Sequence, residues 1–512
     1  MSKFHSVCIL GMLVFAFSVA WGQDSSAQTP STPENGQQQP VPAYGQENAP
    51  PPISENPPLS GLDLPSLEPH AAPLSYLQPG ATFSETADSN VGNNLGNQSF
   101  TSVSRALGSL TLQRLWSNYD LALDYMGGFA YYDVQGQGAK LLQQMDLDQK
   151  VTWKRGQLSL RDSFSYLPEG NFGAAYGSLG SVGISSLGSS VFNGILGGGV
   201  LGSLGLAPRI LNISVADISE NLTPKSAVTA AGGYAFTHFY GNDFSGASFI
   251  GGSQVSGQVG YNRILTSHTQ VALVYGYEGF DFSVLGTAFH SHVIQAMYGH
   301  RISGRMDLLI GAGPQITFID TGQEVCSNLS LSASACVPPY VEIPIAYKDT
   351  RIGVAGQARL RYRFPRTSLD LSYLRFVTNG SGLFAGAQTD IARLSVERPL
   401  NRVWDGFADM GYSRNGRVQP LTPQQMSECG SSSQSSTAAC PVNDATVYSY
   451  GFAGVGVHRA FGHSFHGFAS YQFNELSFNN SFCVSGTPCN RIGNRSVISV
   501  GLDWTPRPIR ID

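Results

Sequence analysis

Apolar residues alternate with small or polar residues at every second position through most of this chain, from about Phe100 to Thr505. In the segment 121–131, for example, one parity carries Leu121, Leu123, Tyr125, Phe129 and Tyr131. A β-strand places residues i and i+2 on the same face, so each run has one apolar face and one small or polar face. The pattern predicts an all-β chain.

The connections between these runs alternate between short turns and longer loops. The eight short turns are 116–119, 154–157, 221–226, 265–269, 302–305, 364–367, 399–403 and 459–464. The longer connections are 89–99, 134–141, 168–209, 241–252, 284–288, 320–350, 379–387, 415–445 and 478–494. Tight turns on one side and long loops on the other are typical of a transmembrane antiparallel up-and-down β-barrel.

Counting the turns gives the number of strands. Eight hairpins supply sixteen strands, and further strands at 77–88 and 495–505 raise the number to eighteen. Sixteen is the alternative, because the segment 77–88 is the weakest match to the alternating pattern. Eighteen is an even number that leaves both termini on the same side, as in bacterial outer-membrane barrels.

Composition agrees with this fold class. Charged residues make up 13% of the chain, whereas soluble proteins contain about 25%. The chain is also rich in glycine, with 59 residues, and 11% of it is aromatic. A net charge of −5 gives no reason to expect a nucleic-acid partner.

The amino terminus has the features of an export signal. Lys3 and His5 precede an apolar run over 7–20, and Ala20 and Gly22 supply small residues for cleavage. The run is shorter than the ~20 residues needed to cross a bilayer, although an uncleaved anchor is the alternative. We therefore expect a signal peptide at 1–22, a disordered Pro/Gln-rich periplasmic linker at 23–75 and a barrel at 76–512.

Six cysteines follow the signal segment, as three pairs that each lie within one long connection. The pairs are Cys326 and Cys336, Cys429 and Cys440, and Cys483 and Cys489. Their spacing favours local disulfides formed in an oxidising compartment. The chain has no CxxC spacing, and we expect neither a metal nor a cofactor.

The hairpin around Pro365 and Arg366 allows a register to be predicted. A two-residue turn there places Phe364 opposite Thr367, Arg361 opposite Asp370 and Leu360 opposite Leu371. Apolar residues then meet on one face, and three arginines share the other. An arginine facing lipid costs about 2–4 kcal/mol near the bilayer midplane, so this face should line the lumen.

The residues that we expect to line the lumen are Arg161, Arg359, Arg361, Arg363, Asp370, Arg393 and Glu397. A cationic wall would give a pore a mild preference for anions. The alternative is that these arginines pair with Asp370 and Glu397 and only stiffen the wall.

With its signal segment, alternating strands, short turns and closing strand Ser499–Trp504, the chain resembles bacterial outer-membrane β-barrels of porin size. The segment Gln78–Asn90 also resembles the opening strand of barrels associated with exopolysaccharide secretion systems. General porins narrow their pore with an infolded third loop. Here the third long connection carries an almost uncharged apolar stretch over 170–206, without the acidic cluster of those constrictions.

The leading hypothesis is a channel for small solutes or an export route across the outer membrane. The alternative is a surface-anchored structural or adhesive barrel that acts through disulfide-stiffened loops. We do not expect an enzyme, because the segment Gly462–Gly467 has histidine where the Gly-x-Ser-x-Gly motif requires its last glycine. The expected partners are outer-membrane lipid and a small solute or polysaccharide, with homo-oligomerisation left open.

Overall fold

The computed structural model describes residues 59–60, 75–90, 100–133, 138–167, 209–239, 250–282, 286–326, 342–378, 380, 383–418, 446–478 and 492–511. Side chains are not described for 321–326 and 342–347. The predicted signal peptide, most of the linker, the six paired cysteine side chains and the stretch 170–206 therefore lie outside the described residues. Among the described residues, no helix is long and apolar enough to cross a membrane.

Most of the described residues lie in β-strands. The strands are β1 (Tyr76–Asp88), β2 (Thr101–Leu115), β3 (Tyr119–Tyr132), β4 (Gly138–Trp153), β5 (Gly156–Leu167), β6 (Arg209–Thr223), β7 (Ser226–Phe239), β8 (Gly252–Thr266), β9 (Thr269–Phe282), β10 (Thr287–Ser303), β11 (Met306–Cys326), β12 (Glu342–Arg363), β13 (Ser368–Thr378), β14 (Ala387–Pro399), β15 (Trp404–Arg417), β16 (Val447–Phe461), β17 (Phe465–Phe478), β18 (Ile492–Trp504) and β19 (Ile509–Arg510).

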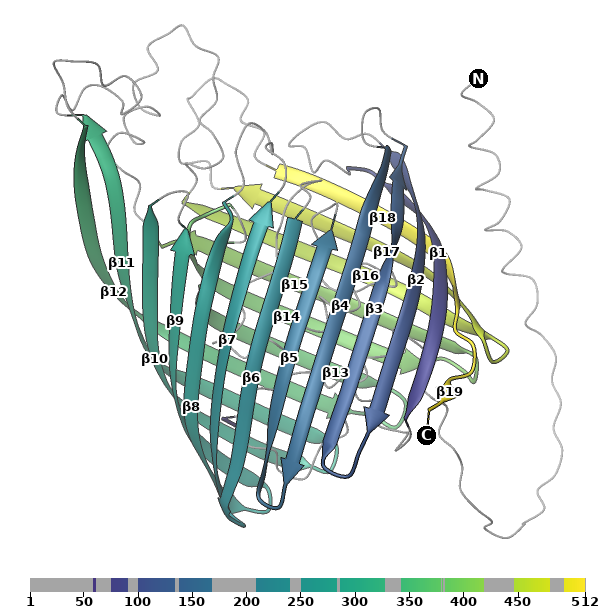
Figure 1. Ribbon diagram of the computed structural model, residues 1–512, viewed down its shortest axis with the longest axis horizontal. Coiled ribbons are helices and arrows are strands. Elements are labelled where there is room, and N and C mark those ends of the chain that lie inside the picture. Colours follow the sequence, from purple (N-terminus) through teal and green to yellow (C-terminus); the bar gives the residue numbers. More distant parts are fainter. Residues whose placement is uncertain are drawn as a thin grey trace, which may run out of the picture. The chain divides into compact units, whose positions relative to one another are not determined.

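These strands close into an antiparallel barrel (Figure 1). Each of β1 to β17 pairs with the next strand in sequence, and β1 also pairs with β18, from Ala81 opposite Trp504 to Asp88 opposite Val497. The two-residue β19 adds to the start of β1. The prediction of eighteen barrel strands is confirmed, including the first strand, and each of the eight predicted short turns joins two consecutive strands. The connection between β9 and β10, predicted among the longer loops, is also short, at four residues.

The predicted hairpin register between β12 and β13 is also confirmed. Arg361 lies opposite Asp370 and Leu360 opposite Leu371. The backbone N–H of Phe364 donates to the carbonyl oxygen of Thr367 at 2.7 Å, which closes the turn. Matching character on both faces of the two strands was sufficient to fix this register.

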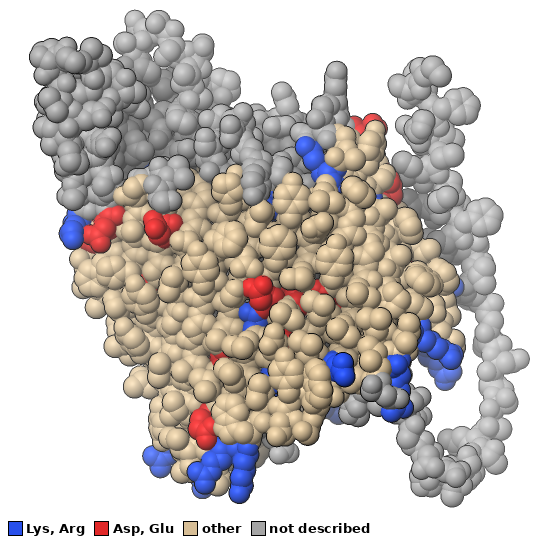
Figure 2. Space-filling view, in the orientation of Figure 1, with Lys and Arg blue, Asp and Glu red and all other residues tan. Residues whose placement is uncertain are grey.

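The two faces of the barrel wall differ in chemistry. One face carries exposed apolar side chains such as Phe83, Val259 and Ile352, which are 62%, 54% and 79% exposed. Along the same strands, the alternate positions carry buried polar side chains such as Thr86 and Gln258. In Figure 2 most of the visible outer surface is uncharged, and Lys and Arg gather at the lower rim near the short turns. The outer face is therefore suited to lipid, and the inner face is polar.

Strand β12 continues well past its pairing with β13. The pairing between the two covers only Gly356–Arg363 of β12, whereas β12 pairs with β11 along its whole length, up to Cys326 opposite Glu342. Within the described residues, 342–355 thus have a strand partner on one side only, and the β11–β12 hairpin extends beyond its neighbours (Figure 1).

Candidate functional site in the barrel interior

Most of the predicted lumen residues gather on three adjacent strands. Arg359, Arg361 and Arg363 share the inner face of β12, Asp370 faces them from β13, and Arg393 and Glu397 follow on β14. Strand pairing places Arg393 opposite Ser372 and Glu397 opposite Ser368. We call Arg359, Arg361, Arg363 and Arg393 the arginine wall.

Carboxylates neutralise much of the arginine wall. Arg359 Nε lies 2.8 Å from Asp370 Oδ2, and Arg361 Nη2 lies 3.8 Å from Asp307 Oδ2. Arg393 pairs with both oxygens of Asp409, at 2.7 Å from Nη2 to Oδ2 and 3.0 Å from Nε to Oδ1. Of the two predicted partners, Asp370 pairs with Arg359, whereas Arg361 takes Asp307 and Arg393 takes Asp409 in place of Glu397.

Sequence reasoning missed two of these partners, Asp307 on β11 and Asp409 on β15. Both lie at inward-facing positions of strands adjacent to the arginine wall. Asp307 is directly opposite Arg361 in the sheet. The alternating pattern of β15 is enough to place Asp409 on the inner face. Its pairing with Arg393 could not be predicted, because cross-strand neighbours depend on the register between β14 and β15. That register places Asp409 opposite Ser395, one diagonal step from Arg393.

The structure places Arg161 on the other side of the barrel from the arginine wall. It lies on β5, nine strands from β14 in the ring of eighteen, and its Nη2 is 2.8 Å from Asp148 Oδ2. Inner positions of β3, β4 and β6 nearby carry four carboxylates, which we call the acidic wall: Asp124, Asp146 and Asp148, which are buried, and Asp217, which is half-buried.

The carboxylate oxygens of the acidic wall differ in their hydrogen bonding. Asp124 lies directly opposite Asp146, and Asp146 Oδ1 accepts from Ser163. By contrast, one buried carboxylate oxygen on each of Asp124, Asp148 and Asp217 has no hydrogen-bond partner in the described structure. Buried acceptors normally find a partner, so these three oxygens are exceptions within the described wall.

A short segment crosses the interior at the end with the long connections. It comprises Gly380 and residues 383–386, and we call it the mouth segment. Leu383, Phe384 and Ala385 are 3%, 1% and 1% exposed. The N–H groups of Leu383 and Phe384 donate to the carbonyl of Gly380 at 3.1 and 3.3 Å, which folds the segment into a turn.

The mouth segment contacts two separate parts of the barrel wall. On one side, Leu383 and Phe384 pack in a cluster with β16 and β17, where the Phe384 and Tyr448 rings are 5.1 Å apart. On the other side, Ala385 joins a cluster with Phe280, Phe282 and Phe289 of β9 and β10. The direct contacts are with Tyr448 of β16 and Phe289 of β10, which are six positions apart in the ring, so the segment reaches two separate parts of the wall.

A glycine makes this crossing feasible. Gly386 has φ of +86°, and a Cβ there would lie 2.4 Å from the Phe289 ring. Its carbonyl accepts from the N–H of Val418 at 3.1 Å. Only glycine combines this backbone conformation with such close approach to an aromatic ring.

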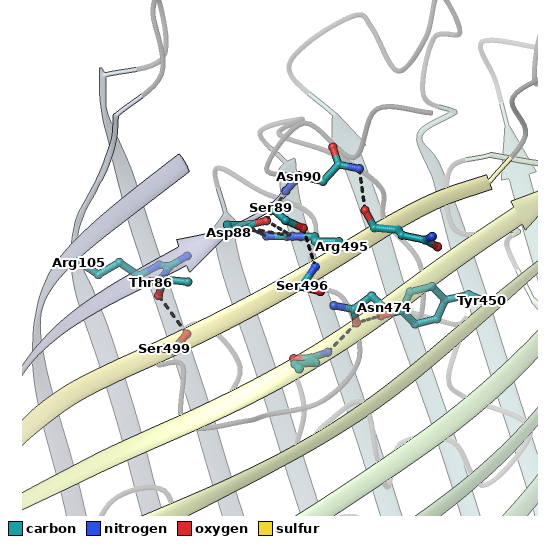
Figure 3. A network of polar contacts seen from close by, with 12 residues as sticks. Thr86, Asp88, Ser89, Asn90, Arg105, Tyr450, Asn474, Arg495, Ser496 and Ser499 are labelled. Atoms are coloured by element: carbon teal, nitrogen blue, oxygen red, sulfur yellow. Dashed lines mark hydrogen bonds and ion pairs between the residues drawn. The ribbon is translucent and has the colours of Figure 1, made fainter. Parts of the chain in front are cut away.

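A polar network joins the first and last barrel strands on the inner face (Figure 3). Arg495 of β18 contacts both carboxylate oxygens of Asp88 of β1, with Nε at 3.0 and 2.8 Å. The side chains are 7% and 1% exposed. Below them, Thr86 pairs with Ser499 at 3.1 Å and accepts from Arg105 of β2 at 2.8 Å. The closure is therefore fixed by buried, charge-assisted contacts as well as by backbone pairing.

Comparison with known proteins gives limited additional information. No protein-family model and no curated protein matches the sequence. Among solved structures, the outer-membrane protein OpdK of Pseudomonas aeruginosa aligns at 9% identity and a TM-score of 0.37, covering 84% of this chain and 98% of its own. OccAB1 of Acinetobacter baumannii aligns at 8% identity and a TM-score of 0.39, covering 84% and 96%. Likenesses of this extent carry no argument about substrate.

Proposed function

We propose that this protein is an outer-membrane channel for small polar solutes. An antiparallel barrel of eighteen strands is wide enough to hold water in its interior. The exposed apolar outer face supports a position in lipid, and a closed barrel leaves no unpaired strand edge within the bilayer. Both observations support a pore in the membrane over a soluble barrel.

The observation that carries the proposal is the pair of opposed charged walls. Arg359, Arg361 and Arg393 lie on one side of the interior, and Asp146 and Asp148 lie on the other. Charged side chains at this density are costly in a dry interior, so they indicate an aqueous path. Since carboxylates pair with the arginine wall, we propose weak charge selectivity in place of a clear anion preference.

The two walls favour a particular class of solute. A molecule that carries both a positive and a negative group can orient between the acidic and arginine walls. A simple anion is attracted to one wall and repelled by the other. We therefore propose that zwitterionic solutes pass faster than anions of equal size.

The mouth segment is the proposed size filter. Leu383, Phe384 and Ala385 narrow the path between β9 and β17 with apolar side chains. Replacing Phe384 by alanine removes the ring that contacts Tyr448 and should widen this point. Phe83 of β1 offers a matched control, because it is 62% exposed on the outer face.

The test is permeation through proteoliposomes and conductance in planar bilayers. We expect measurable current with little dependence on ion sign, faster swelling in amino acids than in anions of equal size, and a larger single-channel conductance for F384A than for F83A. Absence of current from protein that is folded and inserted would overturn the proposal. Passage of long oligosaccharides would instead support an export route, and loop-dependent cell binding without current would support the adhesive alternative.

A further inference from the structure

The interior holds a piece of the chain's own amino-terminal region. Leu59 and Ser60 lie against the inner face of β7, β8 and β10, more than 160 residues from the wall residues that they contact. Ser60 is 1% exposed. Their contacts involve backbone groups, a hydroxyl and an apolar side chain, so both residues are held in a defined position.

The wall holds Ser60 by hydrogen bonds to its main chain and side chain. Its carbonyl oxygen accepts from Thr229 Oγ1 and from Gln258 Nε2, each at 2.9 Å. The hydroxyl oxygens of Ser60 and Thr229 are 2.8 Å apart. Two donors on one peptide carbonyl satisfy both of its lone pairs, as a strand partner or water would otherwise do.

Leu59 is held by one backbone contact and by an apolar pocket. Its N–H donates to Asn262 Oδ1 at 3.1 Å. Its side chain packs against a small cluster on the inner face, formed by Ala272, Val274 and Met297, with Leu309 beside it. The leucine side chain covers this apolar patch and reduces the area of the patch that contacts solvent.

Two glycines in the wall leave the space that the dipeptide occupies. A Cβ on Gly260 would lie 2.3 Å from the Cβ of Ser60, and a Cβ on Gly299 would lie 2.7 Å from Leu59 Cδ2. By contrast, a Cβ on Gly257 of the same strand as Gly260 would meet nothing closer than 3.8 Å. The wall therefore matches the shape as well as the polarity of Leu59 and Ser60.

From these contacts we propose that the inner wall of β7–β10 is a binding site for a short peptide turn, occupied by the chain's own Leu59–Ser60. The site recognises a peptide carbonyl through Thr229 and Gln258, a small hydroxyl side chain beside Gly260 and a leucine in the apolar patch. When Leu59–Ser60 occupies this site, the two residues fill part of the lumen.

The chain is long enough to make this attachment from the side of the short turns. Ser75 Oγ accepts from the N–H of Leu115, at the short-turn end of β2. Fifteen residues separate Ser75 from Ser60 and can span up to roughly 50 Å. Gly260 lies six residues before the end of β8 at Thr266, or roughly 15 Å into a barrel with strands tilted about 40°. A tether of this length gives Leu59–Ser60 a high effective concentration at the binding site.

Disulfide trapping in the full-length protein tests the position directly. Cysteines at S60C and T229C replace hydroxyl groups that are 2.8 Å apart, close to the reach of an S–S bond. Pairing S60C with S470C is the matched control, because Ser470 is buried on the inner face of β17, eight strands from β7 around the ring. We expect the peptide linking residues 60 and 229 in mass spectrometry, and no peptide linking 60 and 470. Equal trapping of both pairs, or none with residue 229, would overturn the proposal.

A wall substitution tests whether the shape of the site matters. G260A places a methyl group on the Ser60 position, and overpacking of this kind costs enough to slow trapping of S60C with T229C about tenfold. G257A should trap at the unaltered rate. Heat-modifiable migration on gels establishes that each variant has folded. Unchanged trapping in folded G260A would contradict the proposed fit.

A third test measures conductance in planar bilayers, and it rests on the proposed channel function. If Leu59–Ser60 fills part of the lumen, G260A should conduct more than G257A. Trapping without any current in any variant would refute the channel but leave the peptide site intact. Equal current through folded G260A and G257A would refute lumen filling by the segment.

Discussion

Removing one partner of the Asp88–Arg495 pair should destabilise the barrel far more than removing an exposed charge. The guanidinium contacts both carboxylate oxygens, and the side chains are 1% and 7% exposed. D88L leaves Arg495 buried without its counter-ion, a change that costs about 3–5 kcal/mol. It also removes the acceptor for the N–H of Asn90, which is 2.9 Å from Asp88 Oδ1.

The measurement is urea unfolding in lipid vesicles, followed by tryptophan fluorescence. A double-mutant cycle separates the pair from its surroundings: R495M alone should cost a similar amount, whereas D88L with R495M should recover most of the loss, because a buried ion pair is often replaceable by apolar side chains. Lys348 and Asp320, 3.5 Å apart with side chains 81% and 47% exposed, provide the control, and K348M should cost about 0–1 kcal/mol. A cost below about 1 kcal/mol for D88L, or additive losses in the double variant, would refute this reasoning.

Three further substitutions test other parts of the barrel by the same unfolding measurement. V259R places a charge on the outer face at a position now 54% exposed and should cost about 2–4 kcal/mol if that face contacts lipid at mid-depth; a negligible cost would argue against a membrane position. G386A adds a Cβ 2.4 Å from the Phe289 ring at φ of +86°, so we expect about 1–2 kcal/mol of destabilisation from the backbone alone together with an altered conductance. G313A places its Cβ 1.7 Å from a backbone oxygen of β10 and should cost about 1–3 kcal/mol; G232A, whose Cβ has no neighbour nearer than 3.8 Å, should be neutral.

The fold was predictable from the sequence because strand periodicity is a local property. Alternation located the strands, and the positions of the short turns fixed their pairing order. In the hairpin of β12 and β13, side-chain character alone gave the register of Arg361 with Asp370. Each of these inferences needs only residues that are close in sequence, or that pair across one tight turn.

Contacts that cross the interior could not be predicted in this way. The mouth segment is an apolar stretch flanked by Gly380 and Gly386, a signal that sequence reasoning could have used, but its walls on β9 and β17 are set by barrel closure. The position of Leu59–Ser60 is even harder to predict from the sequence. The composition of 23–75 indicates that the segment cannot form a core of its own, but not that two of its residues fit the wall of another element.

The one-sided pairing of β12 leaves a strand edge that, among the described residues, has no strand partner. An extended strand with a free edge is a template on which another chain can add, and proteins commonly block such edges with charges or proline. The unpartnered stretch carries Lys348, Asp349 and Arg351, with Lys348 81% exposed. It also contains Pro344, which has no N–H to donate. The extended hairpin can therefore stand above the barrel with an edge that is poorly suited to recruiting strands from neighbouring copies.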